Sequence, residues 1–165
     1  MSVTNSIRAT LERQITEDVN WFLAYGVWKD GGFWADDRNW TTSAQPNQLT
    51  GSPAISVDND DFEPVQNQTY IRAHFMPALR RAATAGPRPE NRHSGTLMLM
   101  VHAPAYQGSG AALNLADELL ERFENHTSLL GVDANVSIQY SEVKDGASVP
   151  PFYVVPVEVG WYAFK

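Results

Sequence analysis

The end of the chain, FYVVPVEVGWYAFK, alternates between two kinds of side chain, and one side of the pattern carries Tyr153, Val155, Val157, Val159 and Trp161. A period of two places alternate side chains on opposite faces of a β-strand. At about 3.3 Å per residue the strand would run on the order of 40 Å, the whole width of a domain this size, so it must bend or project. Pro156 lacks an N–H and Gly160 weakens a strand, which predicts an edge position or a bulge there.

Four earlier segments also have the pattern of strands. AISV, from Ala54, is a short one, and NVSIQY alternates. TYIRAHFMP and TLMLMVHAP are longer, and the second has apolar or half-polar side chains on both faces, which indicates a central strand. The predicted inward residues are Ile71, Ala73, Phe75, Leu97, Leu99, Val101, Val136, Ile138 and Tyr140, and the opposite face carries Tyr70, Arg72, His74, Met98, Met100 and His102.

Two segments have the period of a helix. The first places Val3, Ile7, Leu11 and Ile15 on one face, with Thr4 or Asn5 as the cap. The second, AALNLADELLERF, follows Ser109 as a cap and allows Glu118 to pair with Arg122 one turn later. Its apolar stripe consists of Ala112, Leu115, Ala116, Leu119 and Phe123.

These elements predict an α+β fold: a mostly antiparallel sheet of about four to five strands flanked by two main helices. The chain has 165 residues, 43% of them hydrophobic and 19% charged, which suits one domain with its own core. We divide it into an N-terminal helix (1–19), a Trp-rich arm (20–53) and a core of sheet and helix (54–165).

The Trp-rich arm has no persistent period, and glycine, proline, serine and asparagine interrupt it repeatedly. We therefore expect it to be irregular. It carries four of the five tryptophans, and loops of this length are usually functional or disordered. Its aromatic side chains either fold back onto the core or pack on another subunit. In the second case Trp28, Trp34 and Trp40 are candidate partner contacts.

Arginines gather in the segment RRAATAGPRPENRHSG, in which Gly86, Pro87 and Pro89 oppose a regular element. Because the chain has a formal net charge of −7, this segment stands out. It is either an ordinary solvated loop or one side of a head-to-tail interface. In the second case Arg72, Arg80, Arg81 and Arg88 of one copy would face Asp58, Asp60 and Asp61 of the next.

No catalytic set is recognisable, and we expect no catalytic residue, metal or cofactor. The chain has no cysteine, its four histidines share no metal-ligand spacing, and Phe62 interrupts the acidic cluster where a calcium loop needs an oxygen ligand. Gly108, Ser109 and Gly110 precede a helix, as in phosphate-binding loops, but the third glycine of that motif would fall at Leu113. A tight turn explains these glycines more simply, with a small α/β phosphate- or nucleotide-binding enzyme as the alternative.

Charge and hydropathy limit the partners. A net charge of −7 and a pI of about 4.9 argue against a surface that grips nucleic-acid phosphates. No apolar run approaches the ~20 residues of a membrane helix, and the N-terminus lacks the pattern of a signal peptide. We expect a soluble protein made in the cytosol, with no membrane partner.

The order of the segments YIRAHFMPA, RR, SGTLMLMVHAPAYQGSGAALNLADELLERF and PFYVVPVEV resembles that of the tail terminator proteins of long-tailed bacteriophages. The resemblance covers residues 54–164 and the first helix. It implies an α/β fold with helices against a mostly antiparallel sheet, assembled as a hexameric ring at the head-proximal end of the tail tube. The Trp-rich arm is longer than in that pattern.

The resemblance also implies the partners and the location. The ring would contact the tail tube protein, stop tube growth and offer a docking surface to a head-completion or stopper protein. DNA would pass through its lumen without sequence recognition. We therefore expect a non-enzymatic component of the virion tail, assembled in the host cytoplasm. A neck or stopper component of the same particle is the alternative within this class.

Overall fold

The computed structural model describes residues 2–16, 27–29, 32–35, 39–41, 54–58, 62–64, 68–85, 90–105 and 109–165. Its helices are α1 (Val3–Thr16) and α3 (Gly110–Arg122). The strands of the main sheet are β4 (Ala54–Ser56), β5 (Tyr70–Ala82), β6 (Asn91–Pro104), β7 (Ser128–Leu129), β8 (Val136–Val143), β9 (Ala147–Val149) and β10 (Phe152–Phe164). In the described part of the chain, neither helix is long and apolar enough to cross a membrane.

The main sheet has seven strands in the order β4-β5-β6-β10-β8-β7, with β9 also beside β10. Its pairs are antiparallel except β4 with β5, which run parallel. The predicted α+β class is therefore confirmed, but the count of four to five strands is wrong. β7 and β9 have two and three residues, too few to show a period of two.

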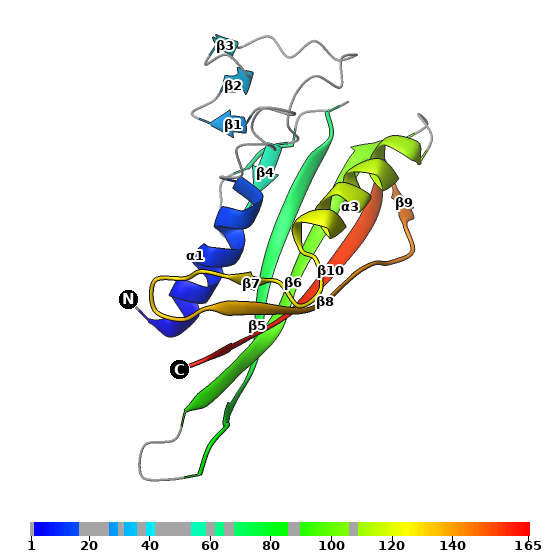
Figure 1. Ribbon diagram of the computed structural model, residues 1–165. Helices are drawn as coiled ribbons and strands as arrows, with labels where there is room; N and C mark the ends of the chain where they lie inside the picture. Colours follow the sequence, from blue (N-terminus) through cyan, green and yellow to red (C-terminus); the bar gives the residue numbers. More distant parts are fainter. Residues whose placement is uncertain are drawn as a thin grey trace.

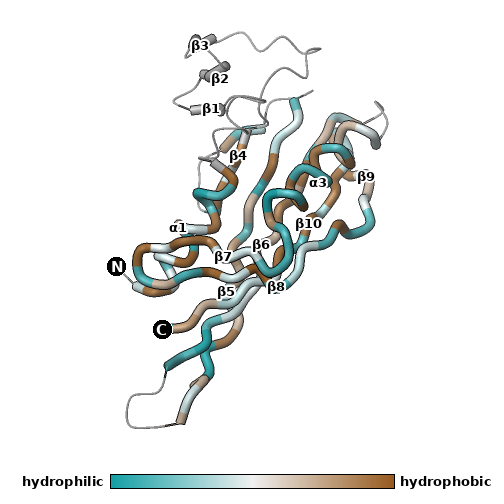
Figure 2. Tube along the Cα trace, viewed as in Figure 1, coloured by the Kyte–Doolittle hydropathy of each residue, from teal (hydrophilic) through white to brown (hydrophobic). Residues whose placement is uncertain are grey.

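Both helices cover the same face of the curled sheet (Figure 1), and one core fills the space between them. Along each helix hydrophobic and hydrophilic residues alternate (Figure 2), because only one side of the helix meets the sheet. The predicted stripes of both helices are buried apart from the partly buried Val3, as are the predicted inward residues of β6 and of residues 155–161 in β10. The other face of the sheet has no helix in the described part of the chain.

The helix caps differ from the prediction at α1. The Asn5 N–H donates to Ser2 Oγ at 3.3 Å, so Ser2 caps the helix and the predicted Thr4 and Asn5 lie inside the first turn. At α3 the predicted Ser109 occupies the N-cap position, but its side chain makes no capping hydrogen bond.

Strand β10 lies inside the sheet, so an edge position for Pro156 is excluded. Along β10, the pairing with β9 ends at Val154 and the pairing with β8 starts at Val157, which leaves Pro156 opposite the gap between β9 and β8. Its carbonyl accepts the Lys144 N–H at 2.8 Å, so its missing N–H faces that gap and interrupts no ladder. The predicted bulge occurs at Gly160, where the register with β8 shifts. Because of this shift Tyr140 lies opposite Gly160, off the face that the alternation predicted.

Strands β5 and β6 continue well beyond their predicted ends. They pair from Tyr70 with His102 as far as Ala82 with Asn91, with a register shift between Pro77 and Leu79. The expectation that the arginine segment contains no regular element is therefore wrong. Gly86, Pro87 and Pro89 lie outside the described residues. We call residues 76–82 and 91–95 the β5–β6 hairpin, and its far end projects beyond the two helices (Figure 1).

The Trp-rich arm contains three short strands, β1 (Val27–Lys29), β2 (Gly32–Ala35) and β3 (Asn39–Thr41). They form an antiparallel sheet in the order β1-β2-β3, so the expectation of a wholly irregular arm is wrong. Aromatic residues stand opposite each other in both pairs, Trp28 with Phe33 and Trp34 with Trp40, and cross-strand aromatic pairs favour such pairing. The predicted contacts of the Trp28, Trp34 and Trp40 side chains lie outside what the structure describes.

Candidate assembly surface

The β5–β6 hairpin exposes seven consecutive residues of β5, from Met76 to Ala82. Both large apolar side chains among them are open to solvent, Met76 at 43% and Leu79 at 44%. β4 pairs with only the first three residues of β5, so the outer edge of residues 76–82 has no strand beside it in the described residues. An uncovered edge of this length is a template for contact with another chain.

Three arginines lie on this hairpin. Arg81 stands directly opposite Arg92 across the two strands, an arrangement that is unfavourable for like charges. Arg80 stands opposite His93. Burial lowers the pKa of His93, and the charge of Arg80 lowers it further. The Arg92 guanidinium lies 4.7 Å from the centre of the Tyr162 ring. Within the described residues none of the three arginines forms an ion pair with a carboxylate.

The other predicted interface arginines are not part of this group. Arg72 lies opposite Met100 in the body of the sheet and is half-buried, so the structure separates it from Arg80 and Arg81. Arg88 lies outside the described residues.

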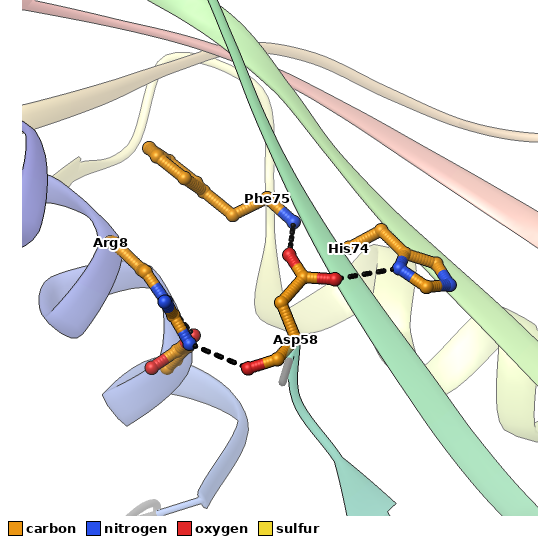
Figure 3. Close-up of polar contacts among 5 residues, drawn as sticks. Arg8, Asp58, His74 and Phe75 are labelled. Atoms are coloured by element: carbon orange, nitrogen blue, oxygen red, sulfur yellow. Dashed lines mark hydrogen bonds and ion pairs between the residues drawn. The ribbon is translucent and has the colours of Figure 1, made fainter. Parts of the chain in front are cut away.

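The predicted acidic side of the interface is also divided. Both carboxylate oxygens of Asp58 are used within the subunit: one accepts the Phe75 N–H and the other meets His74 Nδ1, each at 2.7 Å (Figure 3). Its carbonyl accepts Arg8 Nη2 at 3.2 Å, and Arg8 pairs with Glu12. Burial alone would raise the pKa of Asp58, but these hydrogen bonds and the neighbouring charges lower it. Asp60 and Asp61 lie outside the described residues, so their pairing with the arginines stays a prediction.

An acidic surface that sequence reasoning missed lies on α3. Asp117 and Glu121 are exposed one turn apart, Glu118 lies beside them, and Glu124 follows the end of the helix. Burial raises the pKa of Glu118, the charge of Arg122 opposes this, and Glu121 adds to it. The signal in the sequence was the run of carboxylates on the side of the helix opposite the apolar stripe.

An aromatic cluster lies on the helix-free face. The His102 ring stacks on Tyr70 with centroids 4.3 Å apart, and Phe152 meets both rings edge-on. Burial lowers the pKa of His102 to about 4, helped by the charges of Arg72 and His74. The alternation placed His102 on this face but did not indicate which aromatic residues would cover it.

The structure describes only Ser109 and Gly110 of the alternative phosphate site. Gly110 begins α3, and a Cβ there would meet no atom of the protein within 4 Å, so packing within the subunit does not require a glycine. Gly108 lies outside the described residues. Among the residues that the structure describes, no group of three or more histidines and carboxylates could hold a metal ion.

Comparisons with known proteins agree with this fold. A solved structure with 20% sequence identity superimposes with a TM-score of 0.65, covering 100% of this chain and 96% of its own, and so shows the fold. No curated protein sequence matches the chain. The family model described as "Phage tail terminator protein" matches residues 41–161. That match extends over most of the chain, which therefore belongs to the phage tail terminator family and is a structural component of a phage tail.

Proposed function

We propose that this protein forms a closed, six-membered ring at the head-proximal end of the tail tube. There it stops tube polymerisation and presents a docking surface to a head-completion protein. Membership of the tail terminator family supports a role in tail assembly. The acidic net charge of −7 suits a lumen through which DNA passes without being held.

The observation that carries the ring is the β5–β6 hairpin. Its 91–95 strand is paired with β10 on one side, whereas its β5 strand exposes Met76, Leu79 and a strand edge that no described strand covers. A neighbouring copy that covers it would bury these groups. Because the hairpin fits a different surface on the neighbour, the contact is head-to-tail, and such contacts close into a ring when the rotation allows.

The Trp-rich arm is proposed as a partner contact through Trp28, Trp34 and Trp40. Aromatic anchors contribute much of the binding energy at interfaces. The family model matches this chain from residue 41 onward, so all three tryptophans precede the matched region. This placement suits a contact specific to this phage, with its own tube or head-completion protein.

Tube length tests the proposed function. Purified tail tube protein should polymerise into tubes of uncontrolled length alone, and addition of this protein should stop growth and place a ring on one end, visible by negative-stain electron microscopy. A variant with M76E and L79E, two exposed positions of the hairpin, should remain folded and lose the ring. Its folding is checked by circular dichroism.

Three results would contradict the proposal. Unchanged tube growth with no bound ring removes the terminator role. Binding to isolated heads but not to tubes supports a neck or stopper component instead. Phosphate- or nucleotide-dependent shifts of the Gly110 amide resonance, without ring formation, would favour the enzyme alternative.

A further inference from the structure

The hairpin and α3 carry opposite charges that their own subunit leaves unmatched. On the hairpin, Arg81 and Arg92 oppose each other without a carboxylate partner in the described residues. On α3, Asp117 and Glu121 are exposed one turn apart, and neither forms an ion pair within the described part of the chain. Each pair of like charges is unfavourable in the free subunit, and an opposite pair brought alongside would relieve both.

Many other described carboxylates already have a partner. Asp58 meets His74, Glu12 meets Arg8, Asp133 meets Lys165 at 3.4 Å, and Glu142 and Glu158 both meet Lys144. Of the unpaired ones, Asp117 and Glu121 share one helix face with Glu118 and Glu124 close by, whereas Glu63, Glu90 and Asp145 are single carboxylates on separate loops. The outer face of α3 is therefore the described surface with the strongest unmatched negative charge.

The spacing of Arg81 and Arg92 matches the spacing of Asp117 and Glu121. Directly opposed residues of antiparallel strands have Cα atoms about 4.5 to 5.5 Å apart. Residues four apart on a helix have Cβ atoms about 5 to 6 Å apart. Arg81 and Arg92 could thus each meet one carboxylate of the Asp117 and Glu121 pair.

Each pair of like charges also has an exposed leucine beside it. Leu79 shares a strand face with Arg81, and it is 44% exposed. Leu113 lies one helical turn before Asp117, and it is 42% exposed. Each surface therefore combines one exposed leucine with a pair of like charges, as expected of a protein contact with an apolar centre and charged rim.

Within one subunit the two surfaces cannot satisfy each other. α3 packs against β10, β6 and β8 in the body of the sheet, whereas the hairpin projects from its other end (Figure 1). A second copy supplies the missing surface, and a contact between unlike surfaces is the kind that builds a ring.

We propose that the Arg81 and Arg92 side chains of one copy dock on Asp117 and Glu121 of the next copy, with Leu79 packing against Leu113. The proposal rests on the proposed ring and names its contact. It replaces the acidic loop around Asp58, whose carboxylate is already bonded, with α3 as the surface that receives the hairpin.

Duplex DNA is the competing occupant, because paired arginines also bind phosphates. Two observations favour a second copy. The exposed Leu79 beside the arginines would gain nothing from contact with a phosphate backbone. The subunit as a whole has a net charge of −7, which repels DNA.

Disulfide mapping tests the contact directly, because the chain contains no cysteine. One protein carries A83C, at an exposed position two residues after Arg81, and a size-tagged protein carries N114C, at an exposed position on α3. Mild oxidation of the mixture at low salt should give at least tenfold more mixed dimer than the control mixture of A83C with N135C. Asn135 is exposed on the loop between β7 and β8, which lies against α1 through the hydrogen bond from Asp133 N–H to Ser6 Oγ.

Charge reversal supplies a second readout. R81E/R92E should reduce the mixed dimer at least tenfold, and D117K/E121K should do the same. Mixing an R81E/R92E chain carrying A83C with a D117K/E121K chain carrying N114C should restore it. E63K/D145K makes the same change in net charge at other exposed carboxylates and should leave the mixed dimer unchanged.

The outcomes separate this contact from the ring itself. Rings without excess mixed dimer overturn the contact and leave the ring standing. Excess mixed dimer that charge reversal abolishes, in a protein that never forms rings, supports the contact and overturns the ring. If the protein binds duplex DNA, R81E/R92E abolishes that binding, and no excess mixed dimer forms, then the arginines contact DNA and the proposal is overturned.

Discussion

The indole of Trp161 occupies the space that a side chain on Gly95 would need. A Cβ at Gly95 would lie 2.5 Å from Trp161 Cζ2 and 2.4 Å from the Met76 carbonyl oxygen. The two residues face each other across β6 and β10, and the indole stacks on Phe75 with ring centres 5.3 Å apart. This contact lies at the base of the β5–β6 hairpin, next to the register shift between Pro77 and Leu79.

Substitution of this glycine should therefore be costly. G95A forces backbone and indole apart, and we expect it to lower the free energy of unfolding by about 2 to 3 kcal/mol. Urea denaturation followed by tryptophan fluorescence measures the change. G110A is the matched control, because a Cβ there meets nothing within 4 Å, and its stability should be unchanged or slightly raised. Equal effects of the two variants would show that Trp161 does not exclude a side chain at position 95.

Asp58 joins β4 to β5, and its loss should destabilise the sheet edge. D58N keeps the shape but removes the charge that accepts hydrogen bonds from Phe75 and His74, at an expected cost of about 1 kcal/mol at pH 7. Because the folded state lowers the pKa of Asp58, its contribution is present above pH ~4 and disappears as the pH falls through the folded pKa. Denaturation at pH 7 and pH 3 should show a smaller difference between wild type and D58N at pH 3, because that pH lies below the unfolded pKa of Asp58. D145N, at an exposed site, is the control.

His102 should make the protein less stable in mild acid. Its pKa falls from 6.5 to about 4 on folding, so between these values the unfolded state binds a proton that the folded state does not. Stability is therefore full above pH ~6.5 and is lost as the pH falls toward 4, by on the order of 1 to 2 kcal/mol after allowance for solvent screening. H102F, which keeps an aromatic ring against Tyr70, should flatten this slope.

Nuclear magnetic resonance gives the direct check on His102. The wild-type imidazole should titrate with a midpoint near pH 4, well below a free histidine. A midpoint at 6 or above would mean that the ring is not held neutral between Tyr70 and Phe152. An unchanged acid slope in H102F would assign the slope to other groups.

His126 adopts a backbone conformation that suits glycine or asparagine. Its φ is 67°, its side chain is exposed, and its N–H donates to the Ile138 carbonyl at 2.9 Å. H126G removes the steric penalty and keeps the hydrogen bond, so it should raise the free energy of unfolding by about 0.5 to 1 kcal/mol. Thermal melts compare it with H126A, which retains a Cβ and should gain less. A destabilised H126G would show that the imidazole makes a contribution larger than the backbone strain.

The sequence predicted the elements whose side chains repeat over several turns or pairs. Both helices, the central position of β6 and the inward side of β10 follow from periods that need no knowledge of distant residues. β7, β9 and the continuation of β5 toward Ala82 were missed, because two or three residues show no period and because the prolines beyond the hairpin read as breakers.

The candidate site was predicted only in part. The sequence identified Arg80 and Arg81 as an unusual basic group in an acidic chain, and the structure exposes both on one hairpin. It could not show that Arg72 lies elsewhere, that Asp58 is bonded to His74, or that Arg92 stands opposite Arg81. Those facts depend on strand register, which joins residues far apart in the chain.

What the sequence by itself determined is which face of each element turns inward, because burial of apolar side chains selects that face locally. What only the tertiary structure decided is which charges meet inside the subunit and which remain for a neighbour. Asp58 meets partners 16 and 17 residues away, and Gly95 accommodates Trp161, only once the strands have paired in their native register. Such contacts depend on how all the strands pack together, and a local sequence pattern carries no information about that packing.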